Sequence, residues 1–285
     1  MPQPLAAIPY ETIEGRQNAR LKDLRKRFLR AGWANDGLIA IEGMHLLEEA
    51  ARSDLRIHSI FVRQDMRQSR APAVALAAVG DTLHFLVAPD AFDHACVTES
   101  PQGIAALVEA PQWSLESLLE ESHPLLIVLA GLQDPGNLGT ILRTAEAFRA
   151  SGVLLAPGTV SPWNQKVLRA SAGSCFRLPV IQLEDVTMLE RLQEKGIPIY
   201  ACAAQNGTSV GEASLRGRVA LVIGNEGSGI SDEVRADCIS SIQIPCPGPV
   251  ESLNAAVAAS ILLYEASKQR ARASIASLKA SGNQP

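Results

Sequence analysis

Three short segments rich in glycine, proline and polar side chains could do chemistry, because each follows directly on an apolar run that predicts a β-strand. They are, in chain order, residues 133–145, 225–230 and 247–254. In open α/β sheets, ligands bind outside the carboxyl ends of the strands. We therefore expect the three segments to build one pocket. Ordinary turn chemistry explains any one of them, but three together, each with Asn plus Arg, Glu or Ser, favour a site.

The first segment offers an amide and a cation. Asn137 could hold a ligand, or it could cap a helix that begins at Leu138. Arg143 lies five residues after Leu138, about 140° around a helix and away from its apolar stripe. That position aims a cation at the mouth of the pocket, and an ordinary surface arginine is the alternative.

The second and third segments add a carboxylate, a hydroxyl and a second amide. Glu226 stands between Gly224 and Gly227, where it could hold a polar ligand group or be a solvated turn acid. Ser252 and Asn254 stand where the last predicted helix opens. Helix capping explains one of these two residues easily and both less easily.

Other kinds of site find no support in the pattern. The chain lacks GxxxxGK[ST] and GxSxG, and no GxGxxG follows a strand, since the glycines of 224–229 come in another order. Five cysteines without CxxC and five histidines without HExxH predict neither a disulfide scaffold nor a metal site, and they fit a reducing cytoplasm. We expect no signal peptide and no membrane span, because the apolar runs are short.

Positive charge is concentrated in one stretch, although the formal net charge is -4. Residues 16–30 hold one acid, Asp23, and these basic residues: Arg16, Arg20, Lys22, Arg25, Lys26, Arg27 and Arg30. We predict that they bind RNA, because phosphates respond to the local field within a Debye length. A solvated basic face on an ordinary helix explains the stretch equally well.

The pattern of the whole chain predicts a loose N-terminal segment over 1–15 and a helix over 17–31. Two α/β regions follow. The first region has strand candidates 38–43, 57–63, 83–88 and 102–113, with helices at 44–53 and 71–80. A linker through 113–123 leads to the second region, with strand candidates 125–132, 152–157, 177–183, 197–204, 219–224 and 241–246. These near-continuous apolar runs predict a doubly wound parallel sheet covered on both faces. A helix over 253–270 and a frayed tail follow.

The three segments resemble the sequence motifs of the SpoU (TrmH-like) RNA 2'-O-ribose methyltransferases, within the SPOUT superfamily. Residues 137–145 (NxGxxxRxA), 223–229 (IGNEGxG) and 244–254 (IPxxGxVxSLN) look like the first, second and third motifs, and 164–173 is similar to a further family segment. The resemblance spans roughly 120–270. Less specifically, 38–63 resembles the L30e-like substrate-binding domain of longer members. Cys246-Pro247 stands where many members have a methionine and a small residue, and with Pro249 it should stiffen that loop.

The resemblance implies an α/β fold with a C-terminal SPOUT domain, built on a parallel sheet and a deep trefoil knot, after a smaller L30e-like α/β domain. The implied boundaries are a flexible N-terminus over 1–15, an RNA substrate-binding domain over 16–112, a linker over 113–123, the methyltransferase domain over 124–270 and a flexible tail over 271–285.

The resemblance also implies a cofactor, S-adenosylmethionine, contacted by Gly224, Ile244 and Leu253, mostly through backbone groups. The implied catalytic residues are Asn137, Arg143, Glu226, Ser252 and Asn254. The family proposal makes Arg143 a general base, but arginine side chains keep their proton in proteins. We therefore expect Arg143 to stabilise the developing alkoxide and bind a phosphate. We expect Asn137 and Glu226 to hold Arg143 and the polar loops in place, and Ser252 and Asn254 to orient the nucleotide or the loop.

The function that follows is S-adenosylmethionine-dependent methylation of a ribose 2'-hydroxyl in ribosomal RNA, since the extra domain resembles a ribosomal protein. The alternatives are a transfer-RNA methyltransferase and a non-catalytic RNA-binding or ribosome-assembly protein. A small-molecule methyltransferase fits the basic stretch poorly. The expected partners are RNA of the 23S ribosomal type and a second copy of the chain, with no membrane and no metal. The target nucleotide stays open.

Overall fold

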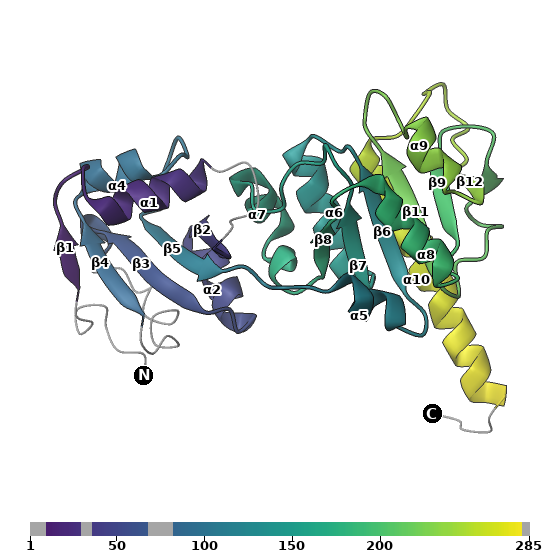
Figure 1. Ribbon diagram of the computed structural model, residues 1–285, viewed down its shortest axis with the longest axis horizontal. Coiled ribbons are helices and arrows are strands. Elements are labelled where there is room, and N and C mark those ends of the chain that lie inside the picture. Colours follow the sequence, from purple (N-terminus) through teal and green to yellow (C-terminus); the bar gives the residue numbers. More distant parts are fainter. Residues whose placement is uncertain (1–9, 30–35, 68–81, 281–285) are drawn as a thin grey trace. The chain divides into compact units, whose positions relative to one another are not determined.

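The computed structural model describes residues 10–29, 36–67 and 82–280 (Figure 1). Arg30 and the predicted helix at 71–80 lie outside these residues. The chain divides into two compact units. We call Met1–Gln112 together with Ser161–Arg177 the N-terminal unit, and Trp113–Val160 together with Leu178–Pro285 the C-terminal unit. The assignment of 161–177 differs from our expectation, which kept that segment within the methyltransferase domain.

The N-terminal unit is built on one mixed sheet with the strand order β1-β4-β3-β5-β2. Strands β1, β4 and β3 are parallel, and β5 runs antiparallel to β3 and β2. The strands are β1 (Glu11–Ile13), β2 (Leu38–Glu42), β3 (Ile57–Arg63), β4 (Leu83–Val87) and β5 (Ile104–Glu109). The N-terminal segment is therefore not wholly loose, because Ile13 is buried and pairs with Val87.

Two helices pack on this sheet, one that the sequence predicts at 17–31 and one at 89–95 that it does not. Helices α1 (Ala19–Phe28) and α4 (Pro89–Ala95) share one core with Phe61 and Phe85 on the sheet. The remaining helical elements are α2 (Met44–Arg52), η2 (Gln64–Met66), α7 (Gln165–Ser171) and η3 (Ser174–Phe176).

The C-terminal unit is a parallel sheet with the order β10-β12-β9-β11-β6-β7-β8, which confirms the predicted α/β class. The strands are β6 (Leu125–Ala130), β7 (Gly152–Leu155), β8 (Val180–Gln182), β9 (Ile199–Ala203), β10 (Thr208–Ser209), β11 (Val219–Gly224) and β12 (Ser240–Gln243). Its helical elements are α5 (Leu115–Glu120), α6 (Pro135–Ala147), η4 (Val186–Leu189), α8 (Glu190–Glu194), α9 (Asp232–Ala236) and α10 (Ala255–Ala280). Among the described residues, no helix is long and apolar enough to cross a membrane.

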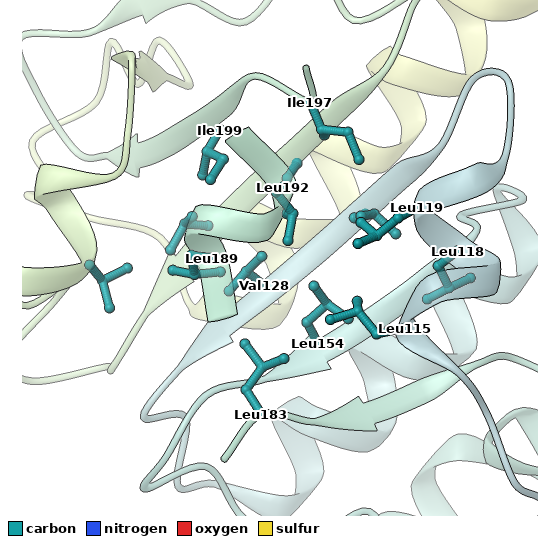
Figure 2. Packing of buried hydrophobic residues seen from close by; sticks show 14 of the residues in the cluster. Leu115, Leu118, Leu119, Val128, Leu154, Leu183, Leu189, Leu192, Ile197 and Ile199 are labelled. Atoms are coloured by element: carbon teal, nitrogen blue, oxygen red, sulfur yellow. The ribbon is translucent and has the colours of Figure 1, made fainter. Parts of the chain in front are cut away.

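Two segments that we expected to be irregular are helical. The predicted linker contains α5, whose Leu115, Leu118 and Leu119 are buried in the core of the C-terminal unit beside Leu154 (Figure 2). The spacing of three and four residues between these leucines indicates a helix with one apolar face, which the prediction of a linker did not take into account. The predicted tail continues α10 as far as Ala280, because residues 271–280 are mostly good helix formers.

The register of the parallel sheet brings the three motif segments to one edge. Strands β6 and β11 pair from end to end, so Ala130 and Gly224 finish side by side. On the other side of β11, strand β9 pairs with β12 up to Ala203 and Gln243. Because all these strands are parallel, the segments after β6, β11 and β12 leave the sheet at the same edge.

Candidate functional site

A cavity of about 480 Å³ opens at this edge, within the range of small-molecule and cofactor sites. Its walls come from the ends of β9, β11 and β12, from the segments that follow β11 and β12, and from the start of α10. The predicted residues that line it are Gly224, Glu226, Ile244, Ser252, Leu253 and Asn254. Asn137 and Arg143 do not line it, so the structure brings together most of the predicted set but not all of it.

The segment after β11 is a tight turn closed by its own backbone. Asn225 and Gly229 exchange two hydrogen bonds, of 2.9 and 3.0 Å. The Asn225 side chain accepts from the backbone N–H of Gly227 at 2.9 Å and donates to the Gly131 carbonyl at 2.8 Å. Sequence reasoning assigned Asn225 no role. The signal was present, because an Asn side chain commonly bonds to the backbone N–H two residues further on, and here that residue is Gly227.

Gly224 is required by the backbone of that turn. A Cβ at position 224 would collide with the carbonyl carbon of Gly229, and it would stand 2.5 Å from its oxygen and 2.7 Å from the Ile230 nitrogen. All three are backbone atoms, which cannot move aside as a flexible side chain can. A side chain here must open the turn.

The segment after β12 keeps its backbone free. Among the residues that the structure describes, no hydrogen bond joins a protein group to a backbone N–H or C=O of residues 245–253. Prolines at 245, 247 and 249 limit the conformations of this exposed segment. Ile223, Ile242 and Leu262 add apolar surface to the same cavity. Unpaired backbone groups beside apolar walls suit a ligand with an aromatic ring and polar edges, so the residues fit S-adenosylmethionine.

A chain of side-chain hydrogen bonds links the three motifs. Asn254 donates from Nδ2 to Asn137 Oδ1 at 3.0 Å, and Asn137 donates from Nδ2 to Glu226 Oε1 at 3.0 Å. Asn254 also caps α10, since its Oδ1 accepts from the backbone N–H groups of Ala256 and Val257. The Asn137 amide is therefore fixed by a donor on one side and an acceptor on the other.

Asn137 is not the cap of α6, in contrast to one of the readings that the sequence allows. The cap is Asp134, whose carboxylate accepts from the backbone N–H of Asn137 at 2.6 Å. The helix begins at Pro135, where a missing N–H costs nothing. Asn137 is thereby released from a capping role, and its side chain is available to Glu226 and Asn254.

The surroundings of Glu226 favour its charged form. Burial raises the pKa of this carboxyl, but a hydrogen bond from Asn137 lowers it. Backbone N–H groups of Glu226, Gln133 and Asp134 also donate to it, and the net pKa lies below the usual value. The latter two groups belong to the approach to α6, where a negative charge is favourable. Glu226 thus fastens the turn after β11 to the start of α6.

Arg143 stands apart from this network. It is exposed on α6 and makes no hydrogen bond or ion pair with any residue in the described part of the chain. We expected Asn137 and Glu226 to hold both Arg143 and the polar loops. In the described part of the chain the two side chains bond to each other and join two of the motif segments, but neither contacts Arg143. Six helical residues turn the chain by about 600°, which leaves Arg143 on another side of α6 than Asn137.

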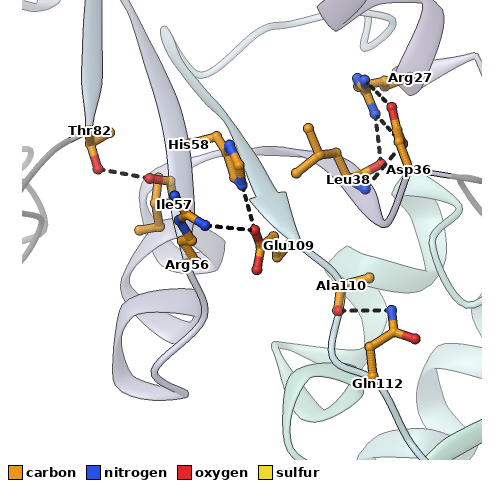
Figure 3. A network of polar contacts seen from close by, with 10 residues as sticks. All are labelled: Arg27, Asp36, Leu38, Arg56, Ile57, His58, Thr82, Glu109, Ala110 and Gln112. Atoms are coloured by element: carbon orange, nitrogen blue, oxygen red, sulfur yellow. Dashed lines mark hydrogen bonds and ion pairs between the residues drawn. The ribbon is translucent and has the colours of Figure 1, made fainter.

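Several arginines of the basic stretch are already occupied within the N-terminal unit. The Arg27 side chain is only 10% exposed and bonds to Asp23, to both carboxylate oxygens of Asp36 and to the Leu38 carbonyl (Figure 3). Arg25 donates to the carbonyls of His94 and Cys96. These side chains hold α1 in place, so their charge is largely committed to the fold.

The outer cations of the stretch are less firmly held. Arg16 pairs with Asp90 at 3.5 Å, and Arg20 pairs with Glu11 at 3.6 Å while its guanidinium lies over the Phe85 ring. Lys22 and Lys26 are exposed and have no ion-pair partner among the described residues. The RNA-binding role predicted for this stretch stays a prediction, and within α1 these two lysines fit it best.

Comparison with known proteins shows which families the chain resembles. Residues 124–264 match the SpoU rRNA Methylase family, and residues 40–114 match a family described as RNA 2'-O ribose methyltransferase substrate binding. A relative from Bacillus subtilis (strain 168), named 23S rRNA (guanosine(2553)-2'-O)-methyltransferase RlmP, is 34% identical over 252 residues. That alignment covers 88% of this chain and 97% of the relative.

Solved structures show the same architecture. The crystal structure of the SpoU methyltransferase AviRb from Streptomyces viridochromogenes in complex with AdoMet matches with a TM-score of 0.79 and 26% identity. The matched region covers 90% of this chain and 99% of the AviRb chain. An AdoMet-bound rRNA methyltransferase from Sinorhizobium meliloti matches with a TM-score of 0.79 and 25% identity, over 91% of this chain and 98% of its own. The resemblance inferred from the motifs is thus confirmed: the chain belongs to the SpoU rRNA methylase family.

Proposed function

We propose that this protein transfers the methyl group of S-adenosylmethionine to a ribose 2'-hydroxyl of ribosomal RNA. The observation that carries the proposal is the cavity in which residues of the second and third motifs meet, in a chain of this family. The Bacillus subtilis relative is named as a 23S rRNA guanosine 2'-O-methyltransferase, and AviRb was solved with AdoMet. The bound cofactor supplies an electrophilic methyl group on a sulfonium centre. The trefoil knot and the cytoplasmic location stay predictions.

The cavity residues hold and orient the cofactor. Gly224 allows the turn after β11 to form one wall, and the unpaired backbone of 245–253 offers donors and acceptors to polar edges. Ile244 and Leu253 enclose an aromatic ring. The hydrogen-bonded chain through Asn137 keeps these walls at a fixed spacing.

Arg143 acts on the RNA and not on the cofactor. It does not line the cavity, and its exposed guanidinium is free to meet a phosphate and the 2'-oxygen that becomes negative during attack. Methyl transfer forms the O–C bond, breaks the S–C bond and releases the hydroxyl proton to solvent or to a nearby acceptor. A fixed cation lowers the energy of the developing alkoxide without taking that proton.

The active form is a homodimer that associates along α6 and α10. An open groove of about 460 Å³ runs between these helices and is lined by Asn137, Thr140, Phe148, Asn254, Val257 and Tyr264, among others. Val257 is 48% exposed and Tyr264 55%, and the two lie in the same groove. The groove begins at two residues of the hydrogen-bonded chain. A second copy seated there would therefore adjoin the site.

Light scattering on purified protein tests the dimer. Val257→Asp with Tyr264→Asp places charge in the groove and should yield monomers, whereas Ile239→Asp, at an equally exposed apolar position outside the groove, should stay dimeric. A wild-type protein that is monomeric at micromolar concentration would contradict the proposal.

Methyl transfer to defined RNA classes tests the activity. Labelled S-adenosylmethionine is incubated with the protein and with deproteinised 23S ribosomal RNA, 16S ribosomal RNA or transfer RNA. The proposal predicts label in 23S RNA. Label only in transfer RNA would favour the alternative substrate. Cofactor binding with no transfer to ribosomal RNA, ribosomal particles or transfer RNA would favour a non-catalytic RNA-binding protein.

A further inference from the structure

The segment between β7 and β8 belongs to the catalytic domain in sequence and to the N-terminal unit in structure. Residues 161–177 pack with the substrate-binding fold, although both flanking strands lie in the parallel sheet of the C-terminal unit. The segment carries helix α7 and the short turn η3. None of the proposed catalytic or cofactor residues lies in it.

Buried polar contacts fasten this segment to the N-terminal unit. Gln165, itself buried, donates from Nε2 to the Ala40 carbonyl of β2 at 2.8 Å. Arg177 pairs with Glu49 of α2 at 2.6 Å, and the Glu49 side chain is only 10% exposed. Gly173, at a φ of +85°, lies so close to Glu49 that a Cβ would stand 2.6 Å from the Glu49 Cβ. The inner face of the segment is therefore held rigidly.

The outer face of α7 is left with two free cations. Gln165, Val167, Leu168 and Ser171 are buried, whereas Lys166 and Arg169 are exposed. Neither side chain forms an ion pair or a hydrogen bond within the described part of the chain. Residues three apart on a helix are neighbours, so the two charges sit on one face.

The arginines of α1 differ from this pair, although Lys22 and Lys26 of the same helix are also unpaired among the described residues. Arginines of α1 are paired with carboxylates or carbonyl groups of their own unit, as Arg27 and Arg25 show. A cation that an acid already neutralises releases few counterions when it meets a phosphate, whereas an unpaired one releases its full share. On an anchored helix, the backbone that carries the two charges needs no further ordering on binding.

We propose that Lys166 and Arg169 form a phosphate-binding pair that holds the backbone of the RNA substrate. The inference rests on the proposed function, because it takes RNA as the ligand. Lys166 acts as a point charge, and Arg169 offers a planar fork that meets two phosphate oxygens at once. Contacts of this kind position the RNA and carry no sequence information. The pair therefore sets affinity and register, and other residues choose the nucleotide.

The test is the salt dependence of binding to 23S ribosomal RNA transcribed in vitro, measured with the full chain. Lys166→Ala with Arg169→Ala should bind roughly tenfold more weakly at low salt, with a log–log salt slope shallower by about 2. Lys166→Arg with Arg169→Lys keeps both charges and should retain the slope. The melting temperature and the affinity for S-adenosylmethionine should be unchanged in both variants, because neither side chain supports the fold or lines the cavity.

A matched control removes the same two charges elsewhere. Lys195 and Arg216 are exposed in the C-terminal unit and unpaired among the described residues, so Lys195→Ala with Arg216→Ala should keep the wild-type slope. The proposal is overturned if the α7 variant keeps that slope, or if the control loses as much. A wild-type protein that binds cofactor but neither binds nor methylates RNA would instead overturn the proposed function itself, and the inference with it.

Discussion

Gly224→Ala is the substitution whose effect the structure defines most sharply. The added Cβ meets only backbone atoms of the turn after β11, at 2.5 Å from the Gly229 oxygen and 2.7 Å from the Ile230 nitrogen. The turn can escape only by opening the two hydrogen bonds between Asn225 and Gly229. Because the same turn carries Glu226 and one wall of the cavity, we expect a loss of cofactor binding.

The magnitude follows from what the turn must give up. Two backbone hydrogen bonds are worth about 0.5–1.5 kcal/mol each, and overpacking of a tight site costs about 1–3 kcal/mol. Together these give about 2–6 kcal/mol. The turn is exposed and can open locally, so most of this cost should appear when the cofactor demands the closed form. We expect an affinity for S-adenosylmethionine at least thirtyfold weaker, at about 1.4 kcal/mol per factor of ten.

Calorimetric titration with S-adenosylmethionine is the assay, and Gly227→Ala is the control. Gly227 lines the same cavity, but its Cβ would stand 3.5 Å from the Asn225 side chain, an ordinary contact. That variant should therefore bind within a few-fold of wild type. A Gly224→Ala protein with wild-type affinity would refute the reasoning. So would equal losses in both variants, because the effect would then not arise from the turn.

Other predictions concern single side chains. Arg143→Ala should abolish methyl transfer in single-turnover assays and keep cofactor binding. Arg143→Lys should keep some activity, and its rate should show no additional titration below pH 9. Activity of Arg143→Lys that appears only as the lysine amine deprotonates would instead indicate that residue 143 acts as a base. Asn254→Ala should weaken cofactor binding and lower the melting temperature, since it removes a cap of about 1 kcal/mol and one support of Asn137; an unchanged protein would show the hydrogen-bonded chain to be idle. The lowered pKa of Glu226 means that its contribution to stability is present above the unfolded pKa of about 4.3 and is lost as pH falls through the folded value. Melting temperatures of wild type and Glu226→Gln should therefore converge once the pH has fallen below the folded pKa of Glu226, and a gap that persists in acid would contradict this. Arg27→Ala should destabilise the N-terminal unit in urea by about 1–3 kcal/mol and leave the salt slope of RNA binding unchanged, because Arg27 is bound to carboxylates; a flatter slope with full stability would refute this.

The parts of the site that could be predicted are those set by local pattern. Apolar runs followed by Gly/Pro segments fix where parallel strands end, and parallel register then forces these ends to one edge, as Ala130 and Gly224 show. The cap of α6 was not predicted, because Asn137 is itself a residue type that caps helices. The pair Asp134-Pro135 nevertheless indicates the start of a helix. The helix α5 was not predicted, because its glutamates and serine are typical of a linker and its leucines at helical spacing were not considered.

What could not be predicted depends on residues that are distant in sequence. The charges of the basic stretch are partly offset by Glu11, Asp36 and Asp90, which come from separate segments of the chain, so the stretch looks more available in the sequence than it is. The transfer of 161–177 to the N-terminal unit rests on contacts such as that between Gln165 and Ala40. The sequence around each of these residues does not indicate which distant residue it contacts.

The central claim is methyl transfer to a ribose 2'-oxygen, and nucleoside analysis tests it most directly. Ribosomal RNA treated with the protein and deuteromethyl-labelled S-adenosylmethionine is digested to nucleosides and examined by mass spectrometry. The account predicts that the label appears on the ribose of one nucleoside, and that Arg143→Ala, with intact cofactor binding, yields none. A label on a base, or an Arg143→Ala protein as active as wild type, would contradict it.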